Sequence, residues 1–598
     1  MRQHPLTRLF ALLLLALPGA ARGGAPDLTT APVRWRDPDD RPVPPPTQVE
    51  ENQVWDIVDH TFFYPVGRLL DLGVAARRLG TLLHVAPRRQ ADNANALDEV
   101  PSSSWFTNRH FLYPLTLEEL RRGPGEAAPD QGGPWEVVAG KFEGGTAGFT
   151  IRDAAGVLYL LKFDSPGNNE MGSAAEAIAT RVLHAAGYHV PRNCVVYFDP
   201  GLLVIGQAAR VPAPGGRKRP MTPADLQGIL AQIPPQPDGR LRCLASQFLP
   251  GVPVGVFDYH GRRADDPNDR VDHEHRRELR GLRVIAAWMN DADRRAANTL
   301  CMFVPDSTGK GHVRHYLIDM GSTFGSNNLE PHRPKYGNEY VWDPRTIFLG
   351  LVTLGLYREP WEEPLPMPYP ELGYFENETF DPGRWVPTYP NPAFAACTPR
   401  DAYWGAKIVT SFTDADIQAM VSEGRYTNPE AAALLARLLA KRRDLIGRYW
   451  FARLNPLDRF SVEGGILGFA DLAVEAGLAS EGETTYRVGL LDGRGRAVGP
   501  ARALEPTDLA PAGVDLVAAA AGDRDHRPRP AQPRDARGTG RPGPMLSLPL
   551  PDTLAAGNFH GVEVRTRRGR GGWSRYTRVY FYRWPDDRWQ LVRVEREE

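Results

Sequence analysis

The stretch that decides the fold is WEVVAGKFEGGTAGFTIRDAAGVLYLLKFD, residues 135–164. It contains two or three short apolar or alternating runs broken by Gly-rich turns, and this pattern predicts β-strands. The segment MGSAAEAIATRVLHAAGYHVP follows, with Ile178, Val182 and Ala186 on one helical face and a Gly and a Pro at its end. Three later runs, CVVYF, LLVIGQ and RCLASQFL, again predict strands. Residues 135–255 are therefore expected to form a small α+β lobe of about five strands and one helix.

C-terminal to this lobe, the pattern changes to helices and then back to strands. The segments RRELRGLRVIAAWMN, TDADIQAMVSEG and NPEAAALLARLLAKRRDLIGRYWFARL have helical periodicity, and the Asn428-Pro429 start of the last is typical of a helix N-terminus. We expect a mainly helical lobe over 256–457, with a Pro- and aromatic-rich stretch of little periodicity at 326–400. Residues 458–598 are strand-like and predict a separate, sandwich-like β-domain with a disordered low-complexity insert at 521–545.

The N-terminal part of the chain precedes the predicted lobes and has a different character. Residues 1–24 combine Arg2 and Arg8, an apolar run that follows them, and small residues, which is typical of a cleaved signal peptide and predicts an exported protein, periplasmic or extracellular. An uncleaved anchor is the alternative, but about nine apolar residues are too few to cross a bilayer, and no later segment is long and apolar enough. Residues 25–134 read as a Pro-rich lead-in and a helical extension, with a helical pattern at 54–83 and a polar, Pro- and Gly-rich segment at 115–134.

Composition excludes some classes of partner. The chain has 598 residues, 42% of them hydrophobic, and a formal net charge of -1. This is ordinary globular composition, and the charge gives no reason to expect a nucleic-acid or anionic-membrane partner. The four cysteines have no CxxC spacing, which argues against the usual zinc motifs. Disulfides and buried free thiols both remain open.

The polar run NDADRRAANT, residues 290–299, is the first candidate for chemistry. Phosphoryl transfer requires a base for the acceptor hydroxyl and oxygen ligands for a metal. Asp293 and Asn298 lie five residues apart, so one loop can present the Asp to the acceptor and the Asn to a metal. Asp291 is a second candidate for the base. The segment LIDMG places Asp319 at a strand end, two residues before a flexible Gly, as a further metal ligand.

The small lobe is then expected to provide the groups that contact the phosphates. Lys162 lies within the apolar strand YLLKFD, where an unpaired ammonium is costly to bury, and Glu176 on the following helix is its expected partner. The turn EGGTAGF precedes this strand and is the candidate phosphate-covering turn. Its candidate nucleotide-binding residues are Gly144, Gly145, Thr146 and Gly148.

The order of these motifs resembles the protein-kinase-like superfamily. The DRRAAN run is most similar to the D-R-H-x-x-N catalytic loop of HipA-like serine/threonine kinases and phosphoinositide-type lipid kinases, and the helix ending in Gly and Val-Pro resembles the HipA-like helix that carries the lysine-pairing glutamate. The resemblance spans roughly 135–455 and implies a two-lobed fold, ATP with Mg or Mn as cofactors, and an acceptor bearing a hydroxyl. The roles that it implies are phosphate contact for Lys162, pairing of that lysine by Glu176, catalysis by Asp293, and metal binding by Asn298 and Asp319.

Three departures from the family pattern accompany this resemblance. Arg295 stands where these families have His, Met320 replaces the Phe of D-F-G, and GGTAG differs from G-x-G-x-x-G. Exported kinase-like proteins of the spore-coat and secretory-pathway types are a class that the chain broadly resembles. Two alternatives stay open: a pseudokinase or nucleotide-binding scaffold without turnover, and an envelope-binding protein that acts through its C-terminal β-domain and aromatic-rich loops.

Overall fold

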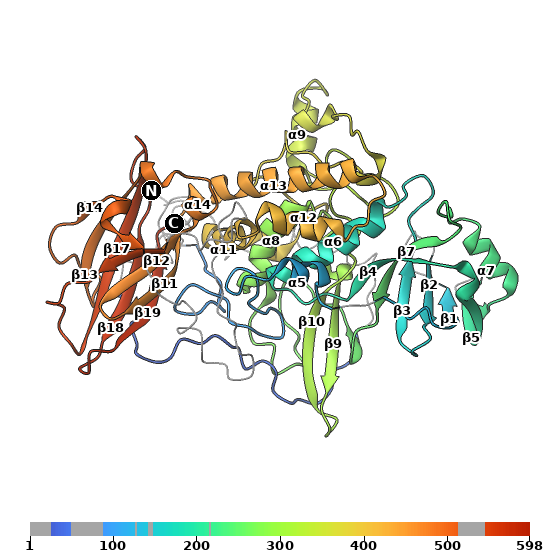
Figure 1. The fold of residues 1–598 in the computed structure, drawn as a ribbon, viewed down its shortest axis with the longest axis horizontal. Coiled ribbons are helices and arrows are strands. Elements are labelled where there is room, and N and C mark those ends of the chain that lie inside the picture. Colours follow the sequence, from blue (N-terminus) through green and yellow to red (C-terminus); the bar gives the residue numbers. More distant parts are fainter. Residues whose placement is uncertain (1–24, 50–87, 126–127, 141–147, 214–216, 512–544) are drawn as a thin grey trace, which may run out of the picture.

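The computed structural model describes residues 25–49, 88–125, 128–140, 148–213, 217–511 and 545–598 (Figure 1). Within them, the fold mixes α and β structure with four separate sheets. Four predicted features lie wholly or mainly outside the described residues: the signal peptide, the helical pattern at 54–83, the glycine turn at 144–146, and the insert at 521–545, of which only Met545 is described. The predicted signal peptide and insert therefore stay predictions.

The strands predicted over 135–247 form one seven-stranded sheet. Its strands are β1 (Trp135–Gly140), β2 (Gly148–Arg152), β3 (Leu158–Lys162), β4 (Asn193–Phe198), β5 (Leu203–Ala213), β6 (Arg217–Pro220) and β7 (Leu241–Gln247). They lie in the order β4-β7-β3-β2-β1-β5-β6, and only the β1–β5 pair is parallel. Strand β6 and helix α7 (Pro223–Leu230) were not among the five or so strands and one helix expected for this lobe. The sheet places β3, which ends in Lys162, between β2 and β7.

Helix α6 (Met171–Ala186) lies beside β4 and β7 and is almost entirely buried. Its start is held by Asp164, whose carboxylate accepts hydrogen bonds from the backbone N–H groups of Glu170 (3.0 Å) and Ser173 (2.7 Å). Its end is at Gly187, which has a φ of 123°. A Cβ there would lie 2.2 Å from the Phe106 ring, so only glycine fits. The predicted cap is thus confirmed, and both ends of the helix are fixed.

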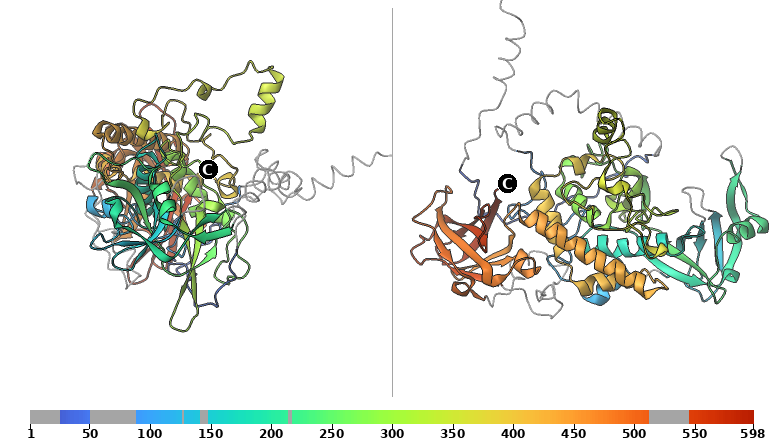
Figure 2. Two further views of the ribbon diagram at one scale, coloured as in Figure 1. Left: turned by 90° about the vertical axis from the view of Figure 1, so that its right-hand side faces the viewer. Right: turned by 90° about the horizontal axis from the view of Figure 1, so that it is seen from above.

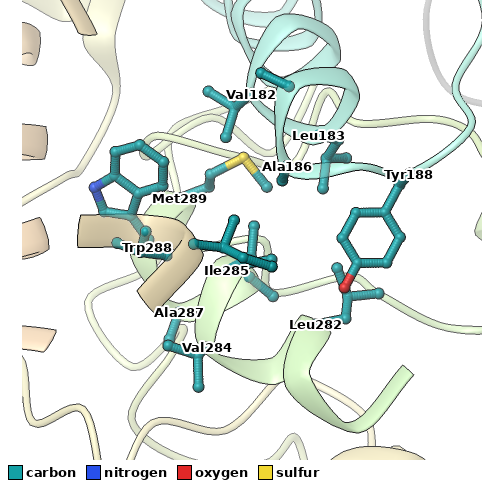
Figure 3. Close-up of a cluster of buried hydrophobic side chains, with 14 of the residues drawn as sticks. Val182, Leu183, Ala186, Tyr188, Leu282, Val284, Ile285, Ala287, Trp288 and Met289 are labelled. Carbon is teal, nitrogen blue, oxygen red and sulfur yellow. The ribbon is translucent and has the colours of Figure 1, made fainter. Parts of the chain in front are cut away.

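The helical part is built around α8 (Arg277–Met289), which has a face packed against α6 (Figure 3). Trp288, Ile285 and Met289 of α8 lie with Val182 and Leu183 of α6 in one buried cluster. The other helices are α5 (Leu117–Arg122), α9 (Pro344–Val352), α10 (Pro392–Ala395), α11 (Pro399–Thr410), α12 (Asp414–Ser422), α13 (Pro429–Phe451) and α14 (Leu472–Glu475). This cluster joins the helical part to the seven-stranded sheet through α6.

Helix α5 lies in the segment at 115–134, whose polar, Pro- and Gly-rich sequence does not indicate a helix. A capping box explains the helix, because the Thr116 side chain accepts from the Glu119 N–H while the Glu119 carboxylate accepts from the Thr116 N–H. Short 3-10 helices are present at Pro200–Leu202, His273–His275, Ala296–Asn298, Pro360–Glu362, Pro370–Leu372, Glu481–Glu483 and Pro506–Asp508.

A three-stranded sheet interrupts the helices. It comprises β8 (Val252–Gly255), β9 (Thr299–Pro305) and β10 (Gly311–Leu317) in the order β10-β9-β8. The mainly helical lobe expected over 256–457 therefore contains a β-hairpin. Its register pairs Thr299 with Leu317, and so brings the residue before β9 close to the residues after β10.

Two sheets occupy the C-terminal part of the chain. One contains β11 (Leu457–Glu463), β12 (Ile466–Asp471), β15 (Ala510–Pro511) and β16 (Met545–Pro549); the other contains β13 (Thr484–Asp492), β14 (Arg502–Leu504), β17 (Asn558–Arg568), β18 (Thr577–Arg583) and β19 (Trp589–Arg596). Residues of both sheets, including Phe469 and Val562, form one hydrophobic cluster. The four cysteines are free thiols.

A buried network of charges joins the segment at 98–99, the helical part and the C-terminal sheets. Asp98 is at its centre and pairs with Arg277 (2.5 Å), Arg400 (2.6 Å) and Arg596 (3.1 Å). We call this set the Asp98 network, and its members are Asp98, Glu99, Arg277, Arg280, Arg400, Asp401, Lys407, Asp458 and Arg596.

Candidate functional site

Three charged side chains from separate elements meet beyond the end of β3. The Lys162 ammonium donates to both carboxylate oxygens of Glu176, at 3.0 and 2.9 Å, and to Oδ1 of Asp319 at 3.1 Å. Lys162 comes from the sheet, Glu176 from α6, and Asp319 from the segment after β10. The structure therefore brings together three of the residues predicted to belong to the site.

A polar residue from β4 also holds Glu176. The Asn193 side chain donates to Glu176 Oε1 at 3.3 Å and to the hydroxyl of Thr180 at 3.0 Å. The Glu176 side chain is only 3% exposed, whereas that of Asp319 is 45% exposed. Lys162 is thus held from the buried side by Glu176, and Asp319 leaves much of its carboxylate accessible.

The backbone at Asp319 is unusual. Asp319 has a φ of 50°, in the left-handed region, and Gly321 follows two residues later. A Cβ on Gly321 would lie 1.8 Å from the Asn328 side-chain oxygen, so no larger residue fits without rearrangement. Met320, which stands where the family pattern has Phe, is fully buried. This close packing fixes the turn from which Asp319 reaches Lys162.

The predicted pair Asp293 and Asn298 is also brought together. The Asn298 Nδ2 donates to the backbone oxygen of Asp293 at 2.5 Å and to its carboxylate at 3.0 Å. Arg295 Nε donates to the other carboxylate oxygen at 3.1 Å. The Asp293 side chain is 29% exposed. The loop therefore holds an accessible carboxylate in a defined orientation.

The hairpin connects this pair to Asp319. The Ile318 N–H donates to the backbone oxygen of Asn298 at 3.0 Å. The buried Arg294 donates to the oxygens of Asn298 (2.8 Å) and Ile318 (3.1 Å) and pairs with Asp291 at 2.9 Å. Asp291 is fully buried in this ion pair, in contrast to Asp293.

The site is strongly charged, and its titration follows from its contacts. Burial alone lowers the pKa of Lys162, but Asp319 and Glu176 outweigh burial and raise the pKa above its usual value. Burial raises the pKa of Asp293, Arg295 and Asn298 lower it, Asp319 raises it, and the net direction is upward. Lys162 is therefore a cation at neutral pH.

The predicted phosphate turn is described only at its end. Gly144, Gly145 and Thr146 lie outside the described residues, whereas Gly148 begins β2 and pairs with Lys162 across the β2–β3 ladder. Of the four candidate residues of the turn, the one that the structure describes thus lies opposite Lys162.

Two residues of the site were not assigned a role from the sequence. The sequence around Asn193 gives no indication of a role in the site, because a lone Asn at the start of a strand is common. Arg294 had a local signal, since it lies three residues after Asp291 in the same polar run. Both act by holding the residues that face the site.

No known protein-family profile matches the chain, and no curated protein does either. Two solved structures share a limited likeness with it. One is a crystal structure of the Golgi casein kinase, with 11% identity, a TM-score of 0.24, and coverage of 56% of this chain and 75% of that chain. The other is the Golgi casein kinase with Mn/ADP bound, with the same identity and TM-score, and coverage of 55% and 74%. With so low a TM-score, the function of this chain is derived from the geometry of its own site.

Proposed function

We propose that this protein is a kinase-like phosphotransferase that moves the γ-phosphate of ATP to a hydroxyl group on a protein, lipid or glycan. One observation carries the proposal: Lys162 lies between Glu176 and Asp319, and the Asn298–Ile318 hydrogen bond joins this trio to Asp293. Each of these groups has a use in phosphoryl transfer, where a protein supplies positioning and charge stabilisation.

The residues fit a nucleotide and a divalent metal. Carboxylate and amide oxygens are the ligands that Mg²⁺ prefers and that Mn²⁺ accepts, and Asp319 and Asn298 offer them. Three carboxylates, from Glu176, Asp319 and Asp293, face two cations, from Lys162 and Arg295. This excess of negative charge suits a bound cation. When bound, ATP and the metal supply the phosphoryl group and part of the charge that stabilises its transfer.

The protein's own groups then have distinct tasks. Lys162 neutralises phosphate charge, and Glu176 keeps its ammonium in place. Asp293 orients the acceptor hydroxyl and takes its proton, for which a raised pKa is favourable because it makes the carboxylate a stronger base. Arg295 and Asn298 keep the Asp293 carboxylate in one orientation.

ATP binding by the full chain tests the proposal, measured by calorimetry with and without Mg²⁺ or Mn²⁺. We expect metal-dependent binding that Asp319→Ala weakens at least about tenfold, since it removes a charged metal ligand. Glu481→Ala removes an exposed carboxylate from the C-terminal part and is the matched control, with unchanged binding.

Transfer of the labelled γ-phosphate to hydroxyl-bearing acceptors is the second measurement. Metal-dependent ATP binding without any transfer would identify a nucleotide-binding scaffold, an alternative that the departure of GGTAG from G-x-G-x-x-G favours. Full transfer activity in Asp319→Ala, or no ATP binding in either protein, would contradict the proposed site.

A further inference from the structure

Exposed apolar side chains are concentrated in one small part of the molecule. Nine of the seventeen exposed large hydrophobic side chains in the described residues lie between 341 and 357. They are Val341, Trp342, Ile347, Phe348, Leu351, Val352, Leu354, Leu356 and Tyr357, with Leu354 90% and Leu356 87% exposed. We call residues 341–357 the α9 projection, because α9 stands out from the body of the molecule there (Figures 1 and 2).

The α9 projection is an ordered element with a well-defined start and end. Asp343 caps α9 by accepting from the N–H groups of Arg345 (3.0 Å) and Thr346 (3.2 Å). The helix is followed by Leu354 and Gly355, whose φ values of 51° and 78° turn the chain back toward the body. Its apolar side chains are therefore presented by a formed helix and turn.

The chemistry of the α9 projection is that of a membrane-interface element. Residues 346–357, TIFLGLVTLGLY, contain no charged side chain. Trp342 precedes the aliphatic tip and Tyr357 ends it, and these two residue types favour the boundary between lipid and water. Two basic residues lie at the base, Arg345, which pairs with Glu359 at 2.7 Å, and the exposed Arg358. The acidic residues there outnumber them; they are Asp343, Glu359, Glu362 and Glu363.

A second copy of the chain is a poorer occupant than lipid. The described side chains of α9 are all at least partly exposed, so the apolar groups of the projection are not gathered on one flat face. A stable protein interface needs a complementary, closely packed surface of about 800 Å² on each partner. Insertion into lipid needs no such matching surface, because each apolar side chain gains free energy by leaving water.

We propose that the α9 projection docks the protein on a lipid bilayer, with Phe348, Leu351, Leu354 and Leu356 inserted among the acyl chains. Because the tip is uncharged and acidic residues outnumber basic ones at the base, the insertion is driven by apolar burial. Neutral phosphatidylcholine is therefore a sufficient surface, and anionic lipid adds little.

The base of the α9 projection is connected through Thr388 to the loop that carries Asp293. The Val341 N–H donates to the backbone oxygen of Thr388 at 2.8 Å, and the Thr388 N–H donates to that of Ala292 at 2.7 Å. Ala292 directly precedes Asp293. If the proposed phosphotransfer holds, docking brings Asp293 to hydroxyl groups carried at a membrane surface; this step alone rests on the proposed function.

Co-sedimentation of the full chain with phosphatidylcholine vesicles tests the docking without ATP. We expect the combined variant Phe348→Ser, Leu351→Ser, Leu354→Ser and Leu356→Ser to lower the partition coefficient about tenfold or more, since four apolar side chains lose their burial. The matched control Val204→Ser, Phe248→Ser, Val252→Ser and Val498→Ser alters four other exposed apolar residues and should change it less than twofold. Added phosphatidylserine or salt should also change the partition coefficient of the wild-type chain less than twofold.

An environment-sensitive dye locates the contact. When the dye is attached at Leu354→Cys, its fluorescence emission should shift to shorter wavelength on addition of vesicles. The emission of the same dye attached at Val498→Cys should not shift, and the labelled wild-type chain gives the background from the native cysteines. Absence of vesicle binding, an unchanged dye at position 354, or equal binding by the projection variant would overturn the proposal. Self-association that the projection variant abolishes, without vesicle binding, would identify a second copy as the occupant instead.

Discussion

The candidate site and the Asp98 network both contain buried charged side chains, yet they differ in the balance of acidic and basic groups. In the Asp98 network, four carboxylates face five basic groups, and the Asp98 side chain is 3% exposed. In the site, three carboxylates face two basic groups, and the Asp319 side chain is 45% exposed.

This difference separates a structural cluster from a functional one. A buried charge is tolerated when its partners are already present, and removing one partner then costs stability. A cluster with excess, accessible carboxylate leaves room for a ligand of opposite charge. The Asp98 network therefore joins parts of the chain, whereas the balance of charge in the site is the one expected of the proposed binding site.

The largest expected effect is the loss of stability on breaking the Asp98 network. Asp98→Asn should lower the free energy of unfolding by about 3–5 kcal/mol, because Arg277, Arg400 and Arg596 lose a shared carboxylate while buried or partly buried. Denaturant unfolding of the wild type and of Asp98→Asn at pH 7 measures this difference in the free energy of unfolding. ATP binding by the folded fraction should not change.

Acid gives a second way to measure this loss. Burial alone raises the pKa of Asp98, but the three arginines outweigh burial and hold the pKa well below its usual range. A carboxyl with a lowered folded-state pKa contributes stability above its unfolded-state pKa of about 3.9 and loses that contribution as pH falls below it. The stability gap between wild type and Asp98→Asn should therefore narrow below about pH 4, and a constant gap would contradict the assignment.

A smaller effect is expected inside the site. Glu176→Gln keeps the shape of the side chain but removes the charge that holds Lys162, so phosphate transfer should fall about 10–100-fold. Its stability should change by about 1 kcal/mol or less, as Lys162 keeps Asp319 as a partner. Initial-rate kinetics and unfolding of the same preparation give both values.

That prediction sharpens the comparison, because it separates activity from stability. If Glu176→Gln destabilised the protein as strongly as Asp98→Asn and left its transfer rate unchanged, then the Lys162 cluster would be structural as well.

The smallest expected effect is a shift in pH dependence. Arg295 lowers the pKa of Asp293, so Arg295→Met should raise it and move the acidic limb of the kcat/KM profile to higher pH by about one unit or less. Arg314→Met, on exposed surface of β10, is the control and should leave the limb in place. An acidic limb that does not move in Arg295→Met would argue against Asp293 as the titrating base.

Some elements could be predicted from the sequence because their signals are local. The strands of 135–164, the Gly187 end of α6 and the Asn428-Pro429 start of α13 were predicted, and the structure confirms them. Each depends on residues within one or two turns or on the strand period of two. Helix α5 has a local signal as well, the Thr116–Glu119 capping box, which the Pro- and Gly-rich surroundings concealed.

The candidate site could be predicted as a set of residues, but its geometry could not. The five-residue spacing of Asp293 and Asn298 and the lysine within an apolar strand can be read from the sequence. The contact between Lys162 and Asp319 spans 157 positions, and no local pattern specifies it. The contact between Asn193 and Glu176 is likewise formed only in the folded chain.

What the sequence by itself determined is the type and order of many local elements and the identity of the charged residues. Only the tertiary structure decided which charges meet and which apolar side chains stay uncovered. Arg596 reaches Asp98 across 498 positions, whereas the apolar side chains of α9 project into solvent. The physical reason is that periodicity and capping act over a few residues, while ion pairing and burial depend on distances that only the folded chain sets.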